Sequence, residues 1–345
     1  MRTLARLLLR RVLLLLALLA TVFVAVDLLP GNTARAVLGR EATPAQVAAK
    51  EHELGLDRPL AVRFREWISG VATGDFGRTA RGRSINELLA DKFPPTLLLG
   101  GLALALTVLA SLLLGARWAG AAFGPGPASG RGNSGSAAAA SPVRSATRAS
   151  GPARQGMRRV GLTRILQPTT TVAAAVPEFV VATLLIMVFA LALGWLPAVT
   201  ITGRSGFPSS PEMLVLPVLA LAVPQIGWNT RVVRAALADA AHAPHVESAV
   251  LDGLPTRTVL LRHMLPFALP TIVASFATTV GMLLGGSLVV ETIFNYPGLG
   301  AVLAGSVADR DTSLVAAVVA LSGVVIMLVL AVADGIRSWS LRGRG

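Results

Sequence analysis

The chain offers few side chains that could carry out catalysis, and none with the spacing of a known catalytic motif. The zinc-hydrolase pattern H-E-x-x-H, the nucleophile elbow G-x-S-x-G and the phosphate-binding G-x-x-x-x-G-K-[ST] are all absent, and neither Lys50 nor Lys92 follows a glycine. His242 and His245 stand three residues apart, but the sequence suggests no further ligands to complete a metal site. The sequence therefore predicts no enzyme, no metal and no other cofactor, and energy from ATP would have to come from another subunit.

One polar segment, Asp239–Pro270, looks suited to docking rather than to catalysis. Residues His245–Leu251 favour a short helix, Gly253 breaks it, and Thr256–Leu265 can resume a helix. A helix, a glycine turn and a second helix lying along a membrane surface would form a compact knob. We expect such a knob to bind a soluble partner.

Two acidic residues stand close to apolar segments. Glu178 follows Pro177, and an acid within a membrane span suggests a transport pathway or a proton site. Glu178 is expected near the cytoplasmic end of its span, where it could also simply reach interfacial water. Asp27 lies near the outer end of the first apolar segment, and the same plain reading is favoured for it.

The composition places the chain in a membrane. Hydrophobic residues make up 53% of it and charged residues only 14%, whereas soluble domains carry about 25% charged residues. Apolar stretches of roughly 20 residues cross a bilayer as helices, because the backbone there must satisfy its own hydrogen bonds. The predicted fold is therefore an all-α polytopic membrane protein with six transmembrane helices, approximately Val12–Leu29, Thr96–Ala116, Phe179–Val199, Met213–Thr230, Phe267–Val290 and Thr312–Ala333.

Arginines predict the orientation of these helices. The net charge is +13, and arginines gather before residue 12, in the loop after the second span and in the C-terminal tail, which are separated by even numbers of spans. The positive-inside rule puts all three regions, and so both termini, in the cytoplasm. This distribution explains the basic charge by topology, so nucleic-acid binding is not expected. The basic N-terminus also resembles a signal peptide, but a retained anchor is favoured because no clear cleavage site follows.

The chain divides into five predicted regions. Residues 121–157 are rich in Gly, Ala, Ser, Pro and Arg, without an apolar face, and favour a flexible cytoplasmic insertion. A plain spacer is preferred there over a regulatory or anionic-lipid contact. The regions are a first transmembrane helix (1–29), an extracytoplasmic subdomain (30–95), a second transmembrane helix (96–120), this insertion (121–157), and a core domain (158–345) that contains the docking segment 239–266.

The docking segment resembles the coupling loop of importer-type ATP-binding-cassette (ABC) permeases, whose pattern is E-A-A-x3-G-x9-I-x-L-P. In that family this loop seats in a groove of the ATPase subunit, so the resemblance implies the same role here. Ser248 and His263 depart from the pattern at tolerant positions, and Asp252 stands where the related group often has lysine, which reverses a charge at the ATPase contact. The implied coupling residues are Glu247, Ser248, Ala249, Asp252, Gly253, Leu265 and Pro266.

Further segments are similar to signatures of the dipeptide/oligopeptide/nickel permease group, and together they cover nearly all of the chain except 121–157. The resemblance implies a type I ABC importer bundle in the cell membrane, a second homologous permease subunit, two ATPase subunits and an extracytoplasmic substrate-binding protein. It also implies a short peptide as the solute, with nickel chelates or glutathione as alternatives. The segments are 28–31, 54–60, 74–77, 176–179, 193–197 and 291–300.

Two rival functions remain in view. A self-sufficient secondary transporter or channel would need no docking knob and would more often show inverted repeats with matching broken helices, which the sequence lacks. A membrane enzyme is disfavoured by the missing catalytic motifs.

Overall fold

The structure is a computed structural model that describes residues 2–29, 31–39, 41–122 and 167–342. Within these ranges the chain is helical and forms no strand, only two isolated β-bridges. Most of the predicted insertion 121–157, from residue 123 onward, lies outside the described residues. Five long helices run along the molecule: α1 (Arg2–Asp27), α5 (Ile85–Ala122), α8 (Glu212–Ala241), α11 (Leu265–Ile293) and α13 (Thr312–Arg342).

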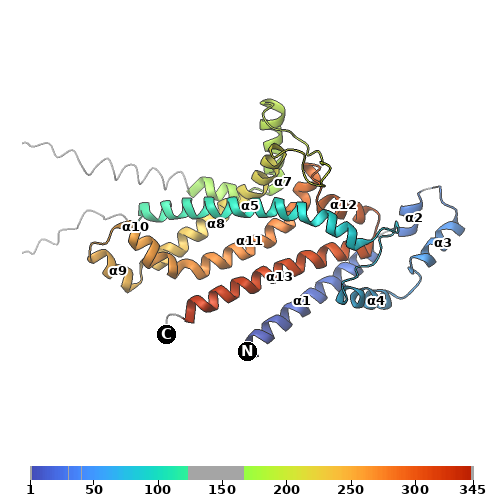
Figure 1. Cartoon of the computed structure of the whole chain (residues 1–345), viewed down its shortest axis with the longest axis horizontal. Helices are drawn as coiled ribbons and strands as arrows, with labels where there is room; N and C mark the ends of the chain where they lie inside the picture. The colour runs from blue at the N-terminus through green and yellow to red at the C-terminus, as the bar shows by residue number, and fades with distance from the viewer. Residues whose placement is uncertain (1, 30, 40, 123–166, 343–345) are drawn as a thin grey trace, which may run out of the picture.

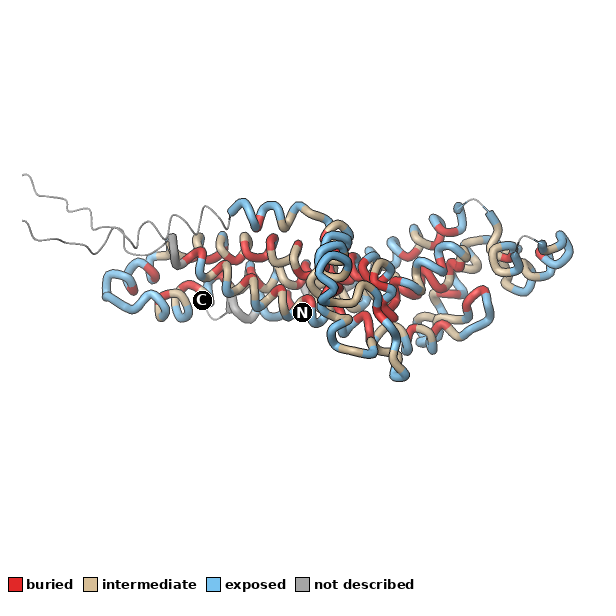
Figure 2. The backbone as a smooth tube through the Cα atoms, turned by 90° about the horizontal axis from the view of Figure 1, so that it is seen from above, coloured by how far each residue is buried: buried red, intermediate tan, exposed pale blue. Residues whose placement is uncertain are grey.

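These long helices pack as neighbours in a bundle whose axis is horizontal in Figure 1. α5 lies against α8, α8 against α11, α11 against α13, and α13 against α1. Gly115 brings α5 close to α8, because a Cβ there would stand 2.6 Å from a methyl of Val233. Buried residues gather where the long helices pack against one another (Figure 2). Leucines such as Leu109 and Leu328 are 60% and 62% exposed, as a lipid-facing surface requires.

All five long helices contain stretches long and apolar enough to cross a membrane. A bent pair, Gln167–Ala175 followed by Glu178–Ala192 with 101° between its halves, is long and apolar enough only when both halves are taken together. Six spans were predicted, and the bundle has six if this pair counts as one. The sequence placed the third span at approximately Phe179–Val199 and did not predict a bend. It begins earlier and breaks at Pro177, which has no N–H to donate and holds the preceding residue in an extended conformation.

Opposite ends of the bundle carry different structures. At one end α9 (Pro244–Leu251), α10 (Thr256–Thr258) and the π-helix Val259–Met264 join α8 to α11, and we name it the α9 end. At the other end lie α2 (Thr33–Leu38), α3 (Pro44–Glu53) and α4 (Leu60–Ala72), and we name it the α3 end. The remaining elements are α7 (Glu178–Leu185), the π-helix Ile186–Ala192 and α12 (Leu299–Ala308).

The α3 end is fastened to the bundle by packing and by charge. Phe23 of α1 contacts Phe64 and Trp67 of α4, with ring centroids 5.4 and 5.9 Å away. Beside this aromatic cluster, Arg63 donates a hydrogen bond of 2.8 Å to the carboxylate of Asp27. Asp27 thus pairs with an arginine at the end of α1, which agrees with its plain structural interpretation.

Candidate functional site

The loop between α8 and α11 protrudes at the α9 end of the bundle (Figure 1). Helix α9 starts at Pro244, whose missing N–H costs nothing in the first turn of a helix, and it ends at Leu251. Gly253 follows with a φ of 75°, a left-handed conformation in which a side chain is strained. A Cβ on Gly253 would have nothing within 4 Å, so the backbone angle alone, and not lack of space, calls for glycine.

One face of α9 is built into the bundle. Val246 and Ala249 are only 3% and 4% exposed and belong to an apolar cluster with residues of α8, of the second π-helix and of α11. Ala249 is small enough for α9 to lie close to the π-helix. His245 adds a second attachment, because its ring lies 4.8 Å from that of Phe267 and its Nε2 is 3.1 Å from the carbonyl of His263.

The other face of α9 and the turn after it are open to solvent. Leu251 is 80% exposed and Val250 59%, and Glu247, Ser248 and Asp252 are exposed beside them. An apolar tip of this kind typically marks a protein contact. The predicted docking residues therefore fall into two groups: Ala249 faces inward and holds the tip, while the others on α9 and its turn face outward.

The remaining predicted residues, Leu265 and Pro266, begin α11 at the base of this tip. The six residues before Leu265 form a π-helix. Pro266 has no N–H for the carbonyl of Arg262, and the wider helix coincides with this missing bond. These two residues therefore lie where the docking tip passes into a long spanning helix.

Glu178 is the first residue of α7 and follows directly after the break in the bent pair of helices. Its side chain rests against α11 at Gly286, where a Cβ would be 2.9 Å from the carboxylate Oε1. Gly286 is about 10 Å before the end of α11 at Ile293, counting 1.5 Å per helical residue. Within the described part of the chain, the Glu178 carboxylate has no hydrogen-bond or ion-pair partner.

A buried polar cluster links α8 and α11, and the sequence analysis did not identify it. The amide of Asn229, fully buried, donates to Thr279 Oγ1 at 2.8 Å, and its oxygen accepts from Ser275 Oγ at 2.7 Å. Such bonds between membrane helices stabilise their pairing by roughly 0.6 kcal/mol each on average. A lone asparagine amid apolar residues was the available signal, but its partners lie on another helix.

At the α3 end the segment 291–300 forms a compact turn on α5. Glu291 is fully buried and accepts a 2.5 Å hydrogen bond from the N–H of Gly300. Cβ atoms at Gly298 and Gly300 would come within 2.5 and 2.9 Å of the Glu291 side chain, which explains the two glycines of this motif. The Tyr296 hydroxyl donates to the Pro95 carbonyl at 2.9 Å, and burial raises the pKa of Tyr296, which keeps it protonated as a donor.

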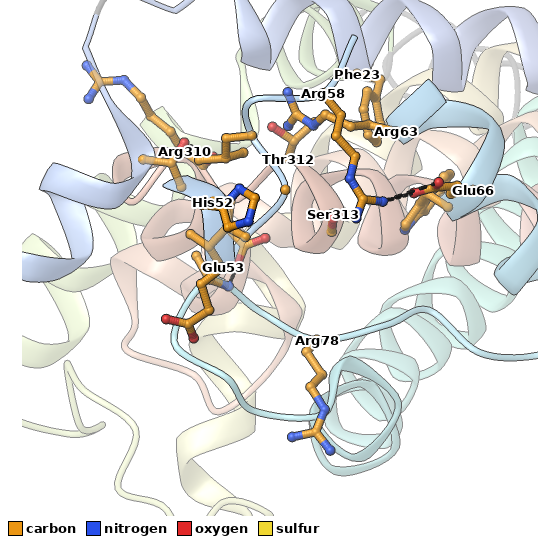
Figure 3. A pocket seen from close by; sticks show the side chains of 17 residues that line it. Phe23, His52, Glu53, Arg58, Arg63, Glu66, Arg78, Arg310, Thr312 and Ser313 are labelled. Carbon is orange, nitrogen blue, oxygen red and sulfur yellow. Dashed lines mark hydrogen bonds and ion pairs between the residues drawn. The ribbon is translucent and has the colours of Figure 1, made fainter. Parts of the chain in front are cut away.

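A cleft of about 350 Å³ opens between α3, α4 and the start of α13 at the same end (Figure 3). Its floor includes Asp311, whose carboxylate accepts from the N–H groups of Ala80 and Leu314 at 2.6 and 3.1 Å. Arg58 pairs across the cleft with Glu66 at 3.2 Å. In the described ranges no cluster of three His, Asp or Glu side chains could hold a metal ion.

Most of the chain matches one family of known proteins. Residues 155–343 match the family described as binding-protein-dependent transport system inner membrane component, and residues 1–99 match its N-terminal region. The glutathione transport system permease protein GsiC of Salmonella typhimurium is 33% identical over 324 residues, 93% of this chain and 91% of its own length. GsiC of Escherichia coli strain K12 is 31% identical over 314 residues, 91% and 89% of the two chains.

These matches extend through both ends of the bundle and the docking tip. The predicted all-helical membrane fold is confirmed, and five or six candidate spans stand where six were predicted. The membrane location and the role as a transport subunit rather than an enzyme are confirmed as well. A permease of this kind works with ATPase and substrate-binding subunits, and ATP is hydrolysed on the ATPases. The chain belongs to the family of binding-protein-dependent transport system inner membrane components and is a multi-pass permease subunit of an ABC importer.

Proposed function

We propose that this permease forms half of the pore of an importer for short peptides, with residues 239–266 as the loop that docks on an ATPase subunit. The observation that carries the docking assignment is the division of α9 into two faces. Its inner face is buried at Val246 and Ala249, while Leu251 at its tip is 80% exposed. A partner that covers this apolar tip removes its cost of exposure to water.

The charges around the tip suggest what the partner surface must offer. Glu247 and Asp252 are both exposed there, so a groove with a basic rim would complement them. In this proposal the α9 end faces the cytoplasm, which agrees with the arginine distribution. A second homologous permease and a second ATPase complete the assembly, and the substrate-binding protein delivers the solute at the α3 end.

The same contacts account for energy coupling. ATP binding closes the two ATPases and moves the tips toward each other. α9 transmits this movement because it is packed against α8 and the π-helix that leads directly into α11. The bundle then switches between two orientations of its pathway, and the ATPase supplies the difference in binding energy that favours one of them.

The solute is proposed to be a short peptide. The relatives at 30 to 33% identity are named as glutathione permeases, and glutathione is itself a small peptide, so it is the favoured alternative within this class. Nickel chelates are the other alternative within the permease group. Uptake assays with the cognate binding protein and each solute in turn decide among them.

Leu251→Asp tests the docking assignment. Because the side chain is exposed, the variant permease should fold and melt as the wild type does, yet its affinity for the ATPase subunits should fall by about tenfold or more, since a buried leucine contributes roughly 1.5–3 kcal/mol. Leu38→Asp, at an exposed apolar position of α2, is the matched control and should leave ATPase binding unchanged. Unchanged affinity in Leu251→Asp, measured with purified subunits, would refute the docking role.

A further inference from the structure

The bent span places against α11 a partly buried carboxylate that has no partner among the described residues. Glu178 opens α7 immediately after the break at Pro177, and its carboxylate rests on Gly286 of α11. Neither α7, α11 nor the helix Gln167–Ala175 contains a lysine, arginine or histidine. The arginines of α8, Arg231 and Arg234, lie in its last three turns toward the α9 end, and Arg234 stacks on Trp118 at 4.4 Å.

A carboxylate without a partner between membrane helices is a favourable place for a cationic group of a solute. A Cβ at position 286 would stand 2.9 Å from Oε1 of Glu178, so glycine there lets the carboxylate rest directly against α11. Interrupted membrane helices, moreover, tend to mark solute sites in transporters. The break at Pro177, the contact with Gly286 and the lack of a counter-charge among the described residues therefore coincide at one point of the bundle.

We propose that Glu178 binds the primary ammonium group of the solute as it passes through the bundle. This proposal rests on the proposed function and narrows it: the solutes are peptides with a free N-terminus, a class that includes glutathione and excludes metal chelates without an ammonium group. Ammonium and carboxylate form a charge-assisted hydrogen bond, which is about twice as strong as a neutral one. Gly286 acts as a positioning residue that holds the carboxylate in place.

The test compares a short peptide with its N-acetylated form in proteoliposomes that contain the whole importer and its binding protein. For each permease the ratio of kcat/KM for the two solutes is measured. The same binding protein serves every variant, so its own preference cancels when ratios are compared. In Glu178→Gln the preference of the wild type for the free ammonium should fall by roughly tenfold to a hundredfold, as expected for loss of a hydrogen bond to a charged group.

Matched controls separate this role from a structural one. Glu212→Gln removes an exposed carboxylate from the first turn of α8 and should keep the wild-type ratio. Gly286→Ala places a methyl group against the Glu178 carboxylate and should reduce the ratio, whereas Gly285→Ala, with nothing within 4 Å of the added Cβ, should not. Glu178→Asp keeps the charge on a side chain shorter by one methylene, so its kcat/KM ratio should lie between those of the wild type and the Gln variant. If the Gln variant does not assemble, the Asp variant is measured in its place.

Two results would overturn the proposal. An equal loss of transport for both solutes would show that the carboxylate serves packing or proton transfer, and an unchanged ratio in Glu178→Gln and Gly286→Ala would show that it does not meet the solute. Failure of the proposed function is distinguishable from both, because then the wild-type importer itself would take up neither peptide while still binding its ATPases.

Discussion

Gly253, Gly286 and Gly300 are glycines for different reasons. Gly253 needs a left-handed backbone and has open space around it, whereas Gly286 and Gly300 each lie beside a carboxylate. Only the first requirement is conformational. The consequence is that the three positions should respond differently to substitution.

Replacement of Gly253 should depend on backbone preference rather than on size alone. Gly253→Val forces a β-branched residue into a left-handed conformation, at a cost of roughly 1–2 kcal/mol or more, and should reduce ATP-dependent uptake by distorting the tip. Gly253→Asn should retain most of the uptake, because asparagine tolerates this conformation. Uptake and ATPase activity of the assembled importer are the measurements. Equal losses in both variants would mean that the position excludes side chains by contact with a partner.

At the scale of elements, prolines stand where a helix breaks or widens. Pro177 separates the halves of the bent span, and Pro266 follows the π-helix at the base of the docking tip. Both residues lack the N–H that a continuous helix would need. The docking tip is accordingly a short helix set on a widened helical base and held by one buried face.

Ala249→Leu should disturb that buried face. Ala249 is 4% exposed between α9 and the π-helix, and the extra methyl groups would overpack the site at a cost of typically 1–3 kcal/mol. We expect a lower melting temperature of the purified permease and weaker ATPase binding together. Val250→Leu, at the adjacent 59% exposed position, should leave the melting temperature unchanged. An unshifted melting temperature in Ala249→Leu would mean that α9 is not held by this packing.

At the scale of the whole molecule, α8 and α11 lead away from the docking tip, and α11 packs against α13, whose start lies at the α3 end. At the α3 end, Asp311 joins the loop of Ala80 to the start of α13 by two hydrogen bonds. Arg81 and Asp309 pair at 2.8 Å beside it. The outer subdomain is thus attached by polar contacts as well as by the aromatic cluster around Phe23.

Asp311 should make stability depend on pH. Burial raises the pKa of its carboxyl above the ordinary value of 3.8, although the N–H groups of Ala80 and Leu314 favour the charged form. The folded state therefore holds this proton more tightly than the unfolded state. The resulting stabilisation is fully present below 3.8 and is lost as pH rises through the raised folded pKa.

Asp311→Asn should remove this dependence. The variant is expected to melt at a lower temperature at every pH because an amide oxygen replaces only one of the two acceptors. The difference in melting temperature between wild type and variant should narrow as pH rises from below 3.8 through the raised pKa of Asp311. Melting curves of the two purified permeases measure the gap. A gap that is constant over this range would contradict the assignment to Asp311.

Much of the architecture could be read from the sequence. Long apolar stretches have one way to satisfy their backbone in lipid, so the helices followed from composition. The pattern Glu247 to Pro266 carried the family, and the left-handed conformation of Gly253 agrees with the break that was predicted there. These features are local, because each depends on the chemistry of neighbouring residues in the chain.

Contacts between distant segments could not be read in this way. The third span was predicted without its bend, and nothing local in the sequence shows that Gly286 lies against Glu178. The partners of Asn229 and Asp311 also lie on other elements. The sequence by itself determined that the chain is a bundle of spanning helices with a docking loop. Only the tertiary structure decided which polar groups meet inside it, because those meetings depend on how separate helices pack.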